Sequence, residues 1–408
     1  MTAAREFDLL IVGGGLVGAS LAAALAPLPL KIAVVEAVPF GSRGQPSFDD
    51  RITAISQGSR RIFESMGVWA GIGAEATPIR HIHVSDRGRL GATRLHAEEA
   101  GVDALGYVTP NRSIGKALTD FIRGKGNITL FAPAKLKSFS VHDTHVQTEV
   151  EAAEPSTLRA KLLIAADGAQ SEVRHQLGIA GKKWDYQQTA VVCNVCVERP
   201  EAETAYERFA DDGPVALLPM GGERYGLIWV ASTEAAPALL GLDDATFLSE
   251  ASARFGGRLG KFTQAGKRVS YPLSMVQAEA QIHKRTLIIG NAAHSLHPIA
   301  GQGFNLSLRD VAMLAEVLAD ALHEGKDFGT AEVLERYVDA RTGDQRSTAI
   351  FTDVLNRLFA NPLATVAWGR NAGLLALELM PTARRALMRH NMGLGGRLPK
   401  LARGLPLL

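Results

Sequence analysis

Cysteine is scarce in this sequence, which holds only Cys193 and Cys196 among 408 residues. Two cysteines cannot build a disulfide framework, and their scarcity suits a reducing compartment. They are spaced as CxxC within TAVVCNVCVE, which reads as a strand, and strand residues three apart point to opposite faces. We therefore interpret both as ordinary structural residues rather than as a redox pair or part of a zinc site.

An excess of charge is also missing. Lys and Arg total 44 and Asp and Glu total 42, which gives a formal net charge of +2. The chain therefore lacks the basic field of a nucleic-acid-binding protein, and nucleic acid is not expected as a partner. His81 and His83 would share a strand face, but no further His or Cys lies at ligand spacing, so no metal site is predicted.

A membrane-spanning run is absent as well. The stretch Leu9–Leu30 carries no charge, but it contains three consecutive glycines and then Pro27 and Pro29. It divides into a strand and a helix, each too short to cross a bilayer. The N-terminus carries acidic residues and no convincing cleavage site, which argues against a signal peptide. We expect a cytoplasmic protein.

The N-terminal region contains a complete dinucleotide-binding pattern. Phe7–Val12 reads as a buried strand, Ala19–Ala26 as an Ala/Leu-rich helix and Lys31–Glu36 as a second buried strand. The turn between the first strand and the helix reads GGGLVG, from Gly13 to Gly18. Strand, glycine loop, helix and strand together form the βαβ unit that binds dinucleotides.

Each glycine of this pattern has a physical role. Gly13 permits the tight turn, Gly15 lets the backbone approach a pyrophosphate, and Gly18 lets helix and strand pack closely. The helix N-terminus offers free N–H groups to the phosphates. Glu36, at the end of the second strand, can accept hydrogen bonds from ribose hydroxyls. The pattern alone does not separate NAD from FAD.

Two further segments favour the longer cofactor. The strand Leu162–Ala166 runs into Asp167-Gly168, where a carboxylate can hold sugar hydroxyls or cap the helix that follows. The strand Thr286–Ile289 precedes Gly290–Asn305, which reads GNAAHSLHPIAGQGFN and contains a second glycine-rich helix start. One long cofactor that touches all three segments explains their order, and FAD fits that description.

Other residues have two interpretations from the sequence alone. Arg51, after Asp49-Asp50, and Arg112, after Asn111, suit arginines along the cofactor or surface ion pairs. His294 and His297 flank the glycine-rich loop, where loop hydrogen bonding is favoured over proton transfer. Trp229 lies in an alternating strand and either lines the substrate side or fills the core.

These residues carry a resemblance that covers nearly the whole chain. GGGLVG with Glu36, Arg51, DGAQSEVR and GNAAHSLHPIAGQGFN resemble the p-hydroxybenzoate-hydroxylase type of flavoprotein aromatic monooxygenase. Within that type the chain is most similar to hydroxylases of ubiquinone biosynthesis, particularly the 2-polyprenyl-6-methoxyphenol hydroxylases. The further matching pieces are HPIAGQGFNLSLRD, Asp353, LFAN at 358–361, GRN at 369–371 and ELMP at 378–381.

The resemblance implies a set of FAD-binding residues. Asn111 is a weaker candidate beside this set, and Asn291 stands where the wider family has Asp, which changes the charge near the flavin by one unit. The implied residues are Gly13, Gly15, Gly18, Glu36, Arg51, Arg112, Asp167, Gly168, Asn291, Gly301, Gln302, Gly303 and Asn305.

The resemblance also implies an activity. NAD(P)H would reduce the FAD, and dioxygen would then form a flavin hydroperoxide that an electron-rich prenylated phenol attacks. No catalytic acid or base is assigned. The alternatives are a non-catalytic FAD-binding subunit of a biosynthetic complex, a hydroxylase of another aromatic substrate, an isoprenoid dehydrogenase or reductase, and a halogenase, whose WxWxIP signature is absent. Other ubiquinone-biosynthesis proteins and the membrane surface are further expected partners.

We expect an α/β fold in which a doubly wound FAD-binding domain carries an inserted β-sheet substrate domain and C-terminal helices. The FAD-binding domain would comprise residues 1–78, 107–176 and 271–335, the substrate domain 79–106 and 177–270, and the helical region 336–408. From Pro381 to Leu408 there are basic residues and no acidic ones, interleaved with apolar side chains. This tail suits either peripheral binding to anionic lipid at the inner membrane or a helix that caps the fold.

Overall fold

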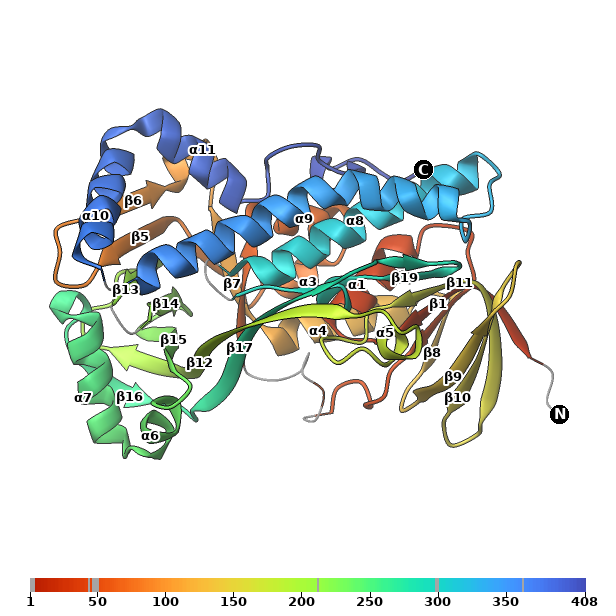
Figure 1. The fold of residues 1–408 in the computed structure, drawn as a ribbon, viewed down its shortest axis with the longest axis horizontal. Coiled ribbons are helices and arrows are strands. Elements are labelled where there is room, and N and C mark those ends of the chain that lie inside the picture. Colours follow the sequence, from red (N-terminus) through yellow and green to blue (C-terminus); the bar gives the residue numbers. More distant parts are fainter. Residues whose placement is uncertain (1–3, 43–44, 46–50, 211–212, 298–300, 362) are drawn as a thin grey trace.

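The computed structural model describes residues 4–42, 45, 51–210, 213–297, 301–361 and 363–408. Two sheet-based halves lie side by side, and the long helix α9 (Ala331–Ala360) extends along one side of both, whereas α8 (Gln302–His323) lies along the half that contains β1 (Arg5–Val12) (Figure 1). The strands β12 (Gly181–Val197) and β17 (Val269–Ala278) run from one half into the other. The described part of the fold is α/β, as predicted.

The first sheet is built around parallel strands in the order β19-β11-β1-β2-β8, with β18 antiparallel at its edge and the hairpin β9–β10 joined to β11. Alternate residues of β1 serve opposite faces, because Leu9 and Ile11 pack among helices whereas Leu10 and Val12 pack with the hairpin. The strands are β1 (Arg5–Val12), β2 (Ile32–Val35), β8 (Ile128–Phe131), β9 (Lys135–Val141), β10 (Val146–Glu151), β11 (Ser156–Ala165), β18 (Ile282–His283) and β19 (Thr286–Ile288).

Helices cover one face of this sheet and contribute most of the larger core cluster. The opposite face is covered by the β9–β10 hairpin and by the short helix α5. The helices of this half are α1 (Leu16–Leu25), α2 (Gln57–Ser65), α3 (Trp69–Gly73), α4 (Asn111–Arg123), α5 (Glu172–Gln176) and α8 (Gln302–His323).

The second sheet has the order β20-β17-β12-β15-β14-β13-β5-β6, with β16 beside β12. Helices α6 (Ala236–Gly241) and α7 (Asp244–Phe255) pack on its outer face. The predicted boundary at residue 271 falls inside β17, which pairs with β12 over ten residue pairs. The strands are β5 (His81–Asp86), β6 (Ala92–His96), β12 (Gly181–Val197), β13 (Thr204–Phe209), β14 (Val215–Pro219), β15 (Arg224–Ser232), β16 (Phe262–Ala265), β17 (Val269–Ala278) and β20 (His294–Ser295).

A small sheet and the C-terminal helices join the two halves. The small sheet consists of β3 (Ile52–Ser56), β7 (Gly106–Pro110) and β4 (Thr77–Ile79). The helices α9 (Ala331–Ala360), α10 (Ala364–Leu379) and α11 (Pro381–Asn391) follow α8. Arg370 on α10 is buried, donates from Nε to Asp86 Oδ2 at 3.0 Å and from Nη1 to the carbonyl groups of Leu358, Phe359 and Asn361. This arginine therefore fixes the α9–α10 turn against β5.

The basic C-terminal tail packs into the fold. Met388, Met392, Leu401 and Leu407 are each less than a tenth exposed, whereas Leu405 and Leu408 are exposed, so part of the apolar surface that suggested a lipid-binding tail faces inward. Three of its six basic residues form ion pairs, since Arg384 contacts Glu99, Arg397 contacts Glu316 and Lys400 contacts Asp320. The capping interpretation therefore describes this segment better.

Candidate functional site

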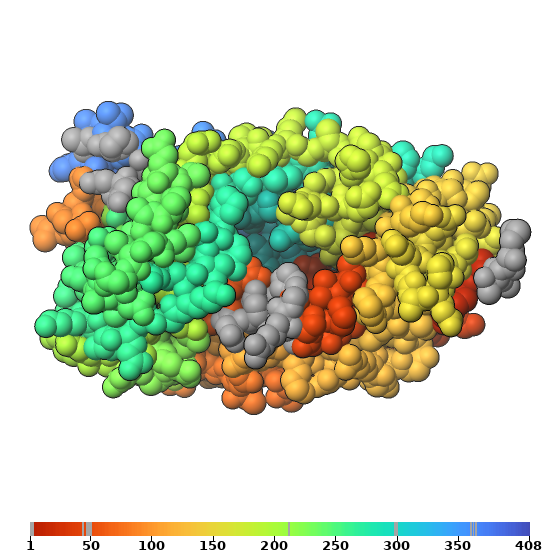
Figure 2. Space-filling model, turned by 90° about the horizontal axis from the view of Figure 1, so that it is seen from below, coloured from red at the N-terminus to blue at the C-terminus, as the bar shows by residue number. Residues whose placement is uncertain are grey.

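A single cavity of about 1230 Å³ extends from the end of β1 to the C-terminal helices. It lies where the two sheets and the small sheet meet, and one face of the molecule is hollowed between the red and orange N-terminal segments and the teal and green strands (Figure 2). Glycines and charged side chains line one end, and apolar side chains line the other. The arrangement suits a polar, extended cofactor beside an apolar ligand.

The glycine loop after β1 has the geometry that its sequence predicts. Gly13 has a φ of +99°, and a Cβ there would lie 2.5 Å from the Ala166 carbonyl oxygen. A Cβ on Gly18 would lie 1.8 Å from the Gly13 carbonyl oxygen, so only glycine lets α1 approach this closely. Gly15 is the N-cap of α1 and lines the cavity. The free N–H groups of α1 thus begin at the cavity wall.

Two carboxylates stand at the carboxyl ends of β2 and β11, the strands on either side of β1. Glu36 accepts from the backbone N–H of Gly14 at 2.7 Å and of Val38 at 3.0 Å, and it lines the cavity. Asp167 accepts from the Val173 N–H through Oδ2 at 3.3 Å, which is the helix-capping role. Its buried Oδ1 has no hydrogen-bond partner among the described residues. Burial raises the pKa of Asp167.

The buried Oδ1 of Asp167, which lacks a hydrogen-bond partner among the described residues, bears on whether a dinucleotide fits this end of the cavity. A buried acceptor without a donor is costly, and a ribose or ribityl hydroxyl would satisfy it. Asp167 and the adjacent Gly168 line the same cavity as Gly13 and Gly15, and Gly168 has a φ of +88°. The donors, the open glycine cradle and the orphaned acceptor therefore fit FAD at this end. Once reduced, FAD supplies the activation of dioxygen for transfer to an aromatic ring.

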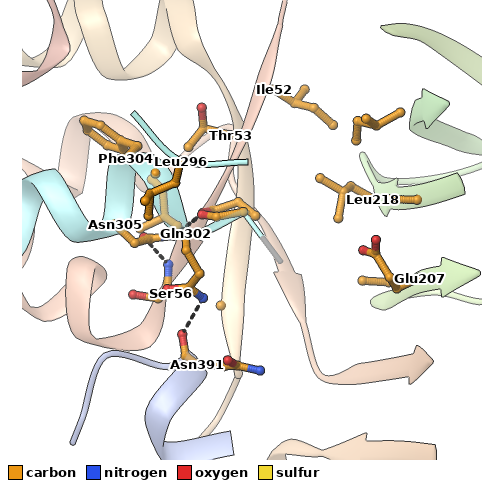
Figure 3. A pocket seen from close by; sticks show the side chains of 18 of the residues that line it. Ile52, Thr53, Ser56, Glu207, Leu218, Leu296, Gln302, Phe304, Asn305 and Asn391 are labelled. Carbon is orange, nitrogen blue, oxygen red and sulfur yellow. Dashed lines mark hydrogen bonds between the residues drawn. The ribbon is translucent and has the colours of Figure 1, made fainter. Parts of the chain in front are cut away.

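The start of α8 forms the next part of the wall (Figure 3). Gly301 has a φ of +59°, and a Cβ on Gly303 would meet no atom within 4 Å. Gln302 donates to the Asn391 carbonyl at 3.2 Å. Asn305 accepts from the Ser56 N–H at 2.8 Å and donates to the carbonyl groups of Ala54 and Gly301. All four residues line the cavity, but Asn305 also holds the start of α8 against β3.

Of the remaining predicted residues, Arg51, Asn291 and Asn111 line the cavity and Arg112 does not. Arg51 and Asn291 line the cavity, and the Arg51 guanidinium lies 4.9 Å from the Tyr271 ring centroid. Asn111 also lines it and accepts from Thr53 Oγ1 at 2.6 Å. Arg112 does not belong to the wall, because its side chain is 44% exposed and pairs with Glu75 at 2.9 Å. Asp49 and Asp50 fall outside the described residues.

The apolar end of the cavity includes one carboxyl that the sequence analysis missed. Glu207 on β13 lines it, together with apolar side chains from β5, β14, β15 and helices α9, α10 and α11. Burial raises the pKa of Glu207 to about 7. The only sequence signal is its position in TAYERF, where Ala205, Glu207 and Phe209 share a strand face.

The structure also shows the surroundings of the histidines, the tryptophan and the cysteines whose roles the sequence left open. His294 Nε2 lies 2.6 Å from Asp310 Oδ2, and burial lowers the pKa of His297 to about 4. Trp229 is buried against Phe247 in the outer core, away from the cavity. Burial raises the pKa of Cys193 to about 12, which disfavours a redox thiolate. Among the described residues, no group of three metal-ligating side chains occurs.

Residues 6–349 match the family described as FAD binding domain, and the chain belongs to that family. The chain is 38% identical over 410 residues to ubiquinone hydroxylase UbiL of Rhodospirillum rubrum, which covers 100% of this chain and 95% of the relative. It is 32% identical over 391 residues to 3-demethoxyubiquinol 3-hydroxylase of Escherichia coli, covering 95% of this chain and 98% of the relative.

Solved structures share the fold at lower identity. The p-nitrophenol 4-monooxygenase PnpA of Pseudomonas putida superposes with a TM-score of 0.80 at 18% identity, covering 97% of this chain and 100% of that one. The predictions of fold class, of FAD with NAD(P)H as co-substrate and of a flavin-dependent aromatic hydroxylase are confirmed. The individual FAD contacts remain predictions.

Proposed function

We propose that this protein hydroxylates a polyprenylated phenol in ubiquinone biosynthesis, using FAD, NAD(P)H and dioxygen. The cavity carries the proposal, because a polar cofactor-binding end continues into an apolar end with space for a prenyl chain. The relatives named for ubiquinone hydroxylation span the chain from end to end, which supports the same substrate class.

The wall residues have separate roles in this proposal. Gly13, Gly15 and the start of α1 hold the pyrophosphate, and Glu36 and Asp167 accept from sugar hydroxyls. The start of α8, from Gly301 to Gly303, faces the flavin ring. The apolar side chains of β5, β13 and the C-terminal helices exclude water from the reacting ring, which protects the activated oxygen from unproductive decay.

Deletion of the gene is expected to stop ubiquinone synthesis at a prenylated phenol, because the proposed hydroxylation would then have no catalyst. The measurement is mass spectrometry of extracted quinones, with wild type and complemented strains as controls. Normal ubiquinone in a strain without a compensating hydroxylase would contradict the proposed pathway.

The purified holoenzyme separates the remaining alternatives. Substrate-stimulated NAD(P)H oxidation distinguishes an enzyme from a non-catalytic FAD-binding subunit. Incorporation of labelled oxygen from dioxygen into the product distinguishes a hydroxylase from a dehydrogenase or reductase of isoprenoids.

We further propose peripheral association with a membrane through helices α9 and α10. Among the described residues, no helix is long and apolar enough to span a bilayer. Large apolar side chains are nevertheless exposed on these helices, and their spacing places them on one side of each helix. They are Ile350 at 53%, Val354 at 53%, Leu358 at 36%, Trp368 at 77%, Leu375 at 43% and Leu379 at 81% exposed.

The double variant Trp368→Gln/Leu379→Gln is expected to weaken binding to lipid vesicles, measured by co-sedimentation, by at least about a hundredfold, because each exposed apolar side chain contributes about 1.5–3 kcal/mol when buried. Val269→Gln, at another exposed apolar position, is the matched control. Equal sedimentation of the double variant and the wild type would show that this face does not bind lipid.

A further inference from the structure

Glu207 stands among apolar side chains on the cavity-facing side of β13. Ala205 and Phe209, two residues away on β13, flank Glu207 along its strand, and Val84 on β5 and Ala216 on β14 stand opposite it. All four line the same cavity as Glu207. A lone carboxyl among apolar neighbours costs free energy unless it serves a ligand.

Glu207 lies in the apolar end of the cavity. Figure 3 shows its side chain projecting from the sheet beside Leu218 and Ile52, with Gln302 and Leu296 across the space. Further along the same strand, Phe209 stacks on Phe359 of α9 with ring centroids 3.4 Å apart. A ring placed between Glu207 and the start of α8 would thus direct a prenyl chain towards the C-terminal helices.

No hydrogen bond or ion pair to the Glu207 carboxyl occurs among the described residues. The residues on either side of it in sequence, Tyr206 and Arg208, point to the other face of the strand, where the Tyr206 hydroxyl donates to Glu201 and the Arg208 guanidinium lies near Gly256. The charged side chains in the cavity wall besides Glu207 are Glu36, Arg51 and Asp167, which belong to the cofactor end.

Most groups that the helices and strands around Glu207 present to it are apolar. The charged group on the same face of β5 is Asp86, opposite Phe209, and it is paired with Arg370. Helix α9 contributes Phe351, Leu355 and Phe359 to the wall, and α10 contributes Leu374 and Leu377. The titratable Tyr271 belongs to the wall beneath Arg51. Burial is the cause of the raised pKa of Glu207, which reaches about 7. The carboxyl can therefore both accept and release a proton near neutral pH.

We propose that Glu207 accepts a hydrogen bond, and then the proton, from the hydroxyl of the phenolic substrate. This role rests on the proposed function. In the step, the phenol O–H bond breaks, its electron pair stays on the ring oxygen, and the proton moves to a carboxylate oxygen of Glu207. No electron is transferred. The resulting phenolate donates electron density into the ring, which makes the ring carbon a better nucleophile for oxygen transfer.

The test compares two probes on the FAD-loaded enzyme. The first is 2-(3-methylbut-2-enyl)phenol, and the second is its methyl ether, which has the same shape but no hydroxyl proton. We expect the phenol to bind roughly ten- to a hundredfold more tightly than the ether above neutral pH, because only the phenol donates to a carboxylate. Its affinity should rise through about pH 7 as Glu207 ionises, whereas that of the ether should not.

Glu207→Gln keeps the shape and removes the ionisation. This variant should lose the pH-dependent rise in phenol affinity, retain its flavin content and oxidise the phenol roughly a hundredfold more slowly. Glu207→Asp should restore part of the pH dependence. Glu250→Gln, an exposed carboxyl on α7, is the control and should behave like wild type.

The outcomes separate the two proposals. If the enzyme binds both probes with the same affinity at every pH, the cavity still binds an aromatic ring, as the proposed function requires, but the proposed role of Glu207 is wrong. If Glu207→Gln keeps the pH-dependent rise, the role is also wrong. If the enzyme binds neither probe, the proposed function fails and the role of Glu207 fails with it.

Discussion

A Gly15→Val enzyme is expected to purify without flavin. Gly15 is the N-cap of α1 with a φ of −65° and a ψ of −173°, which other residues adopt readily, so the backbone need not change. The added side chain instead occupies space at the cavity wall where the pyrophosphate must approach the N–H groups. A loss of about 3 kcal/mol would weaken FAD binding by more than a hundredfold.

The measurement is flavin absorbance per protein, with circular dichroism to establish that the variant folds. Gly126→Ala is the matched control, because a Cβ there meets no atom within 4 Å and Gly126 lies outside the cavity wall. A folded Gly15→Val protein that keeps wild-type flavin would refute the assignment of this loop to the pyrophosphate.

Asp310→Ala is expected to lower the free energy of unfolding by about 3–5 kcal/mol. Asp310 is fully buried on α8 and accepts from His294 at 2.6 Å, Arg341 at 2.6 Å and Gln345 at 3.0 Å. Its removal leaves Arg341 buried with one carboxylate partner, Asp344, and releases the segment that follows β19. Urea unfolding of the apo and FAD-loaded proteins measures the loss.

The lowered pKa of Asp310 also makes the stability of the folded protein depend on pH. The charges of Arg341 and His294 hold the pKa of Asp310 well below its usual value despite burial. A carboxyl with a depressed pKa stabilises the folded state above its unfolded pKa of about 3.9, and that contribution is lost as the pH falls further. Asp310→Asn should remove this dependence below about pH 4. An unchanged acid-unfolding curve would show that Asp310 does not stabilise the fold through its charge.

The cofactor end was predictable because local sequence determines it. Strand, glycine turn and helix start follow one another within a few residues at Gly13–Gly18, and Asp167-Gly168 follows its own strand directly. The direction of the Arg112 side chain was harder to predict, because an arginine at a helix start can reach either the cavity or Glu75. Which of the two it reaches depends on how the helix packs. Asn305 was placed beside the flavin, whereas the structure shows its amide also bound to Ser56 and Ala54.

The substrate end could not be derived in the same way. Glu207 faces the cavity only because β13 pairs with β5, more than a hundred residues away in the sequence, and this register decides which face is inward. The tail was ambiguous for a similar reason. Its alternation of basic and apolar residues suits lipid as well as a protein core, and long-range contacts with the first core cluster bury Leu401 and Leu407.

Helix α9 borders two apolar environments on adjoining sides. Phe351, Leu355 and Phe359 line the cavity, while Ile350, Val354 and Leu358 are exposed on the same helix. Each exposed residue directly precedes a cavity residue in sequence, and consecutive residues of an α-helix are about 100° apart around its axis. A polyprenyl chain resting against the outer side would therefore need only this one helix to shift in order to exchange its hydrocarbon surroundings for the enzyme interior. Passage through bulk water, where such a chain is nearly insoluble, would then be unnecessary for either substrate or product.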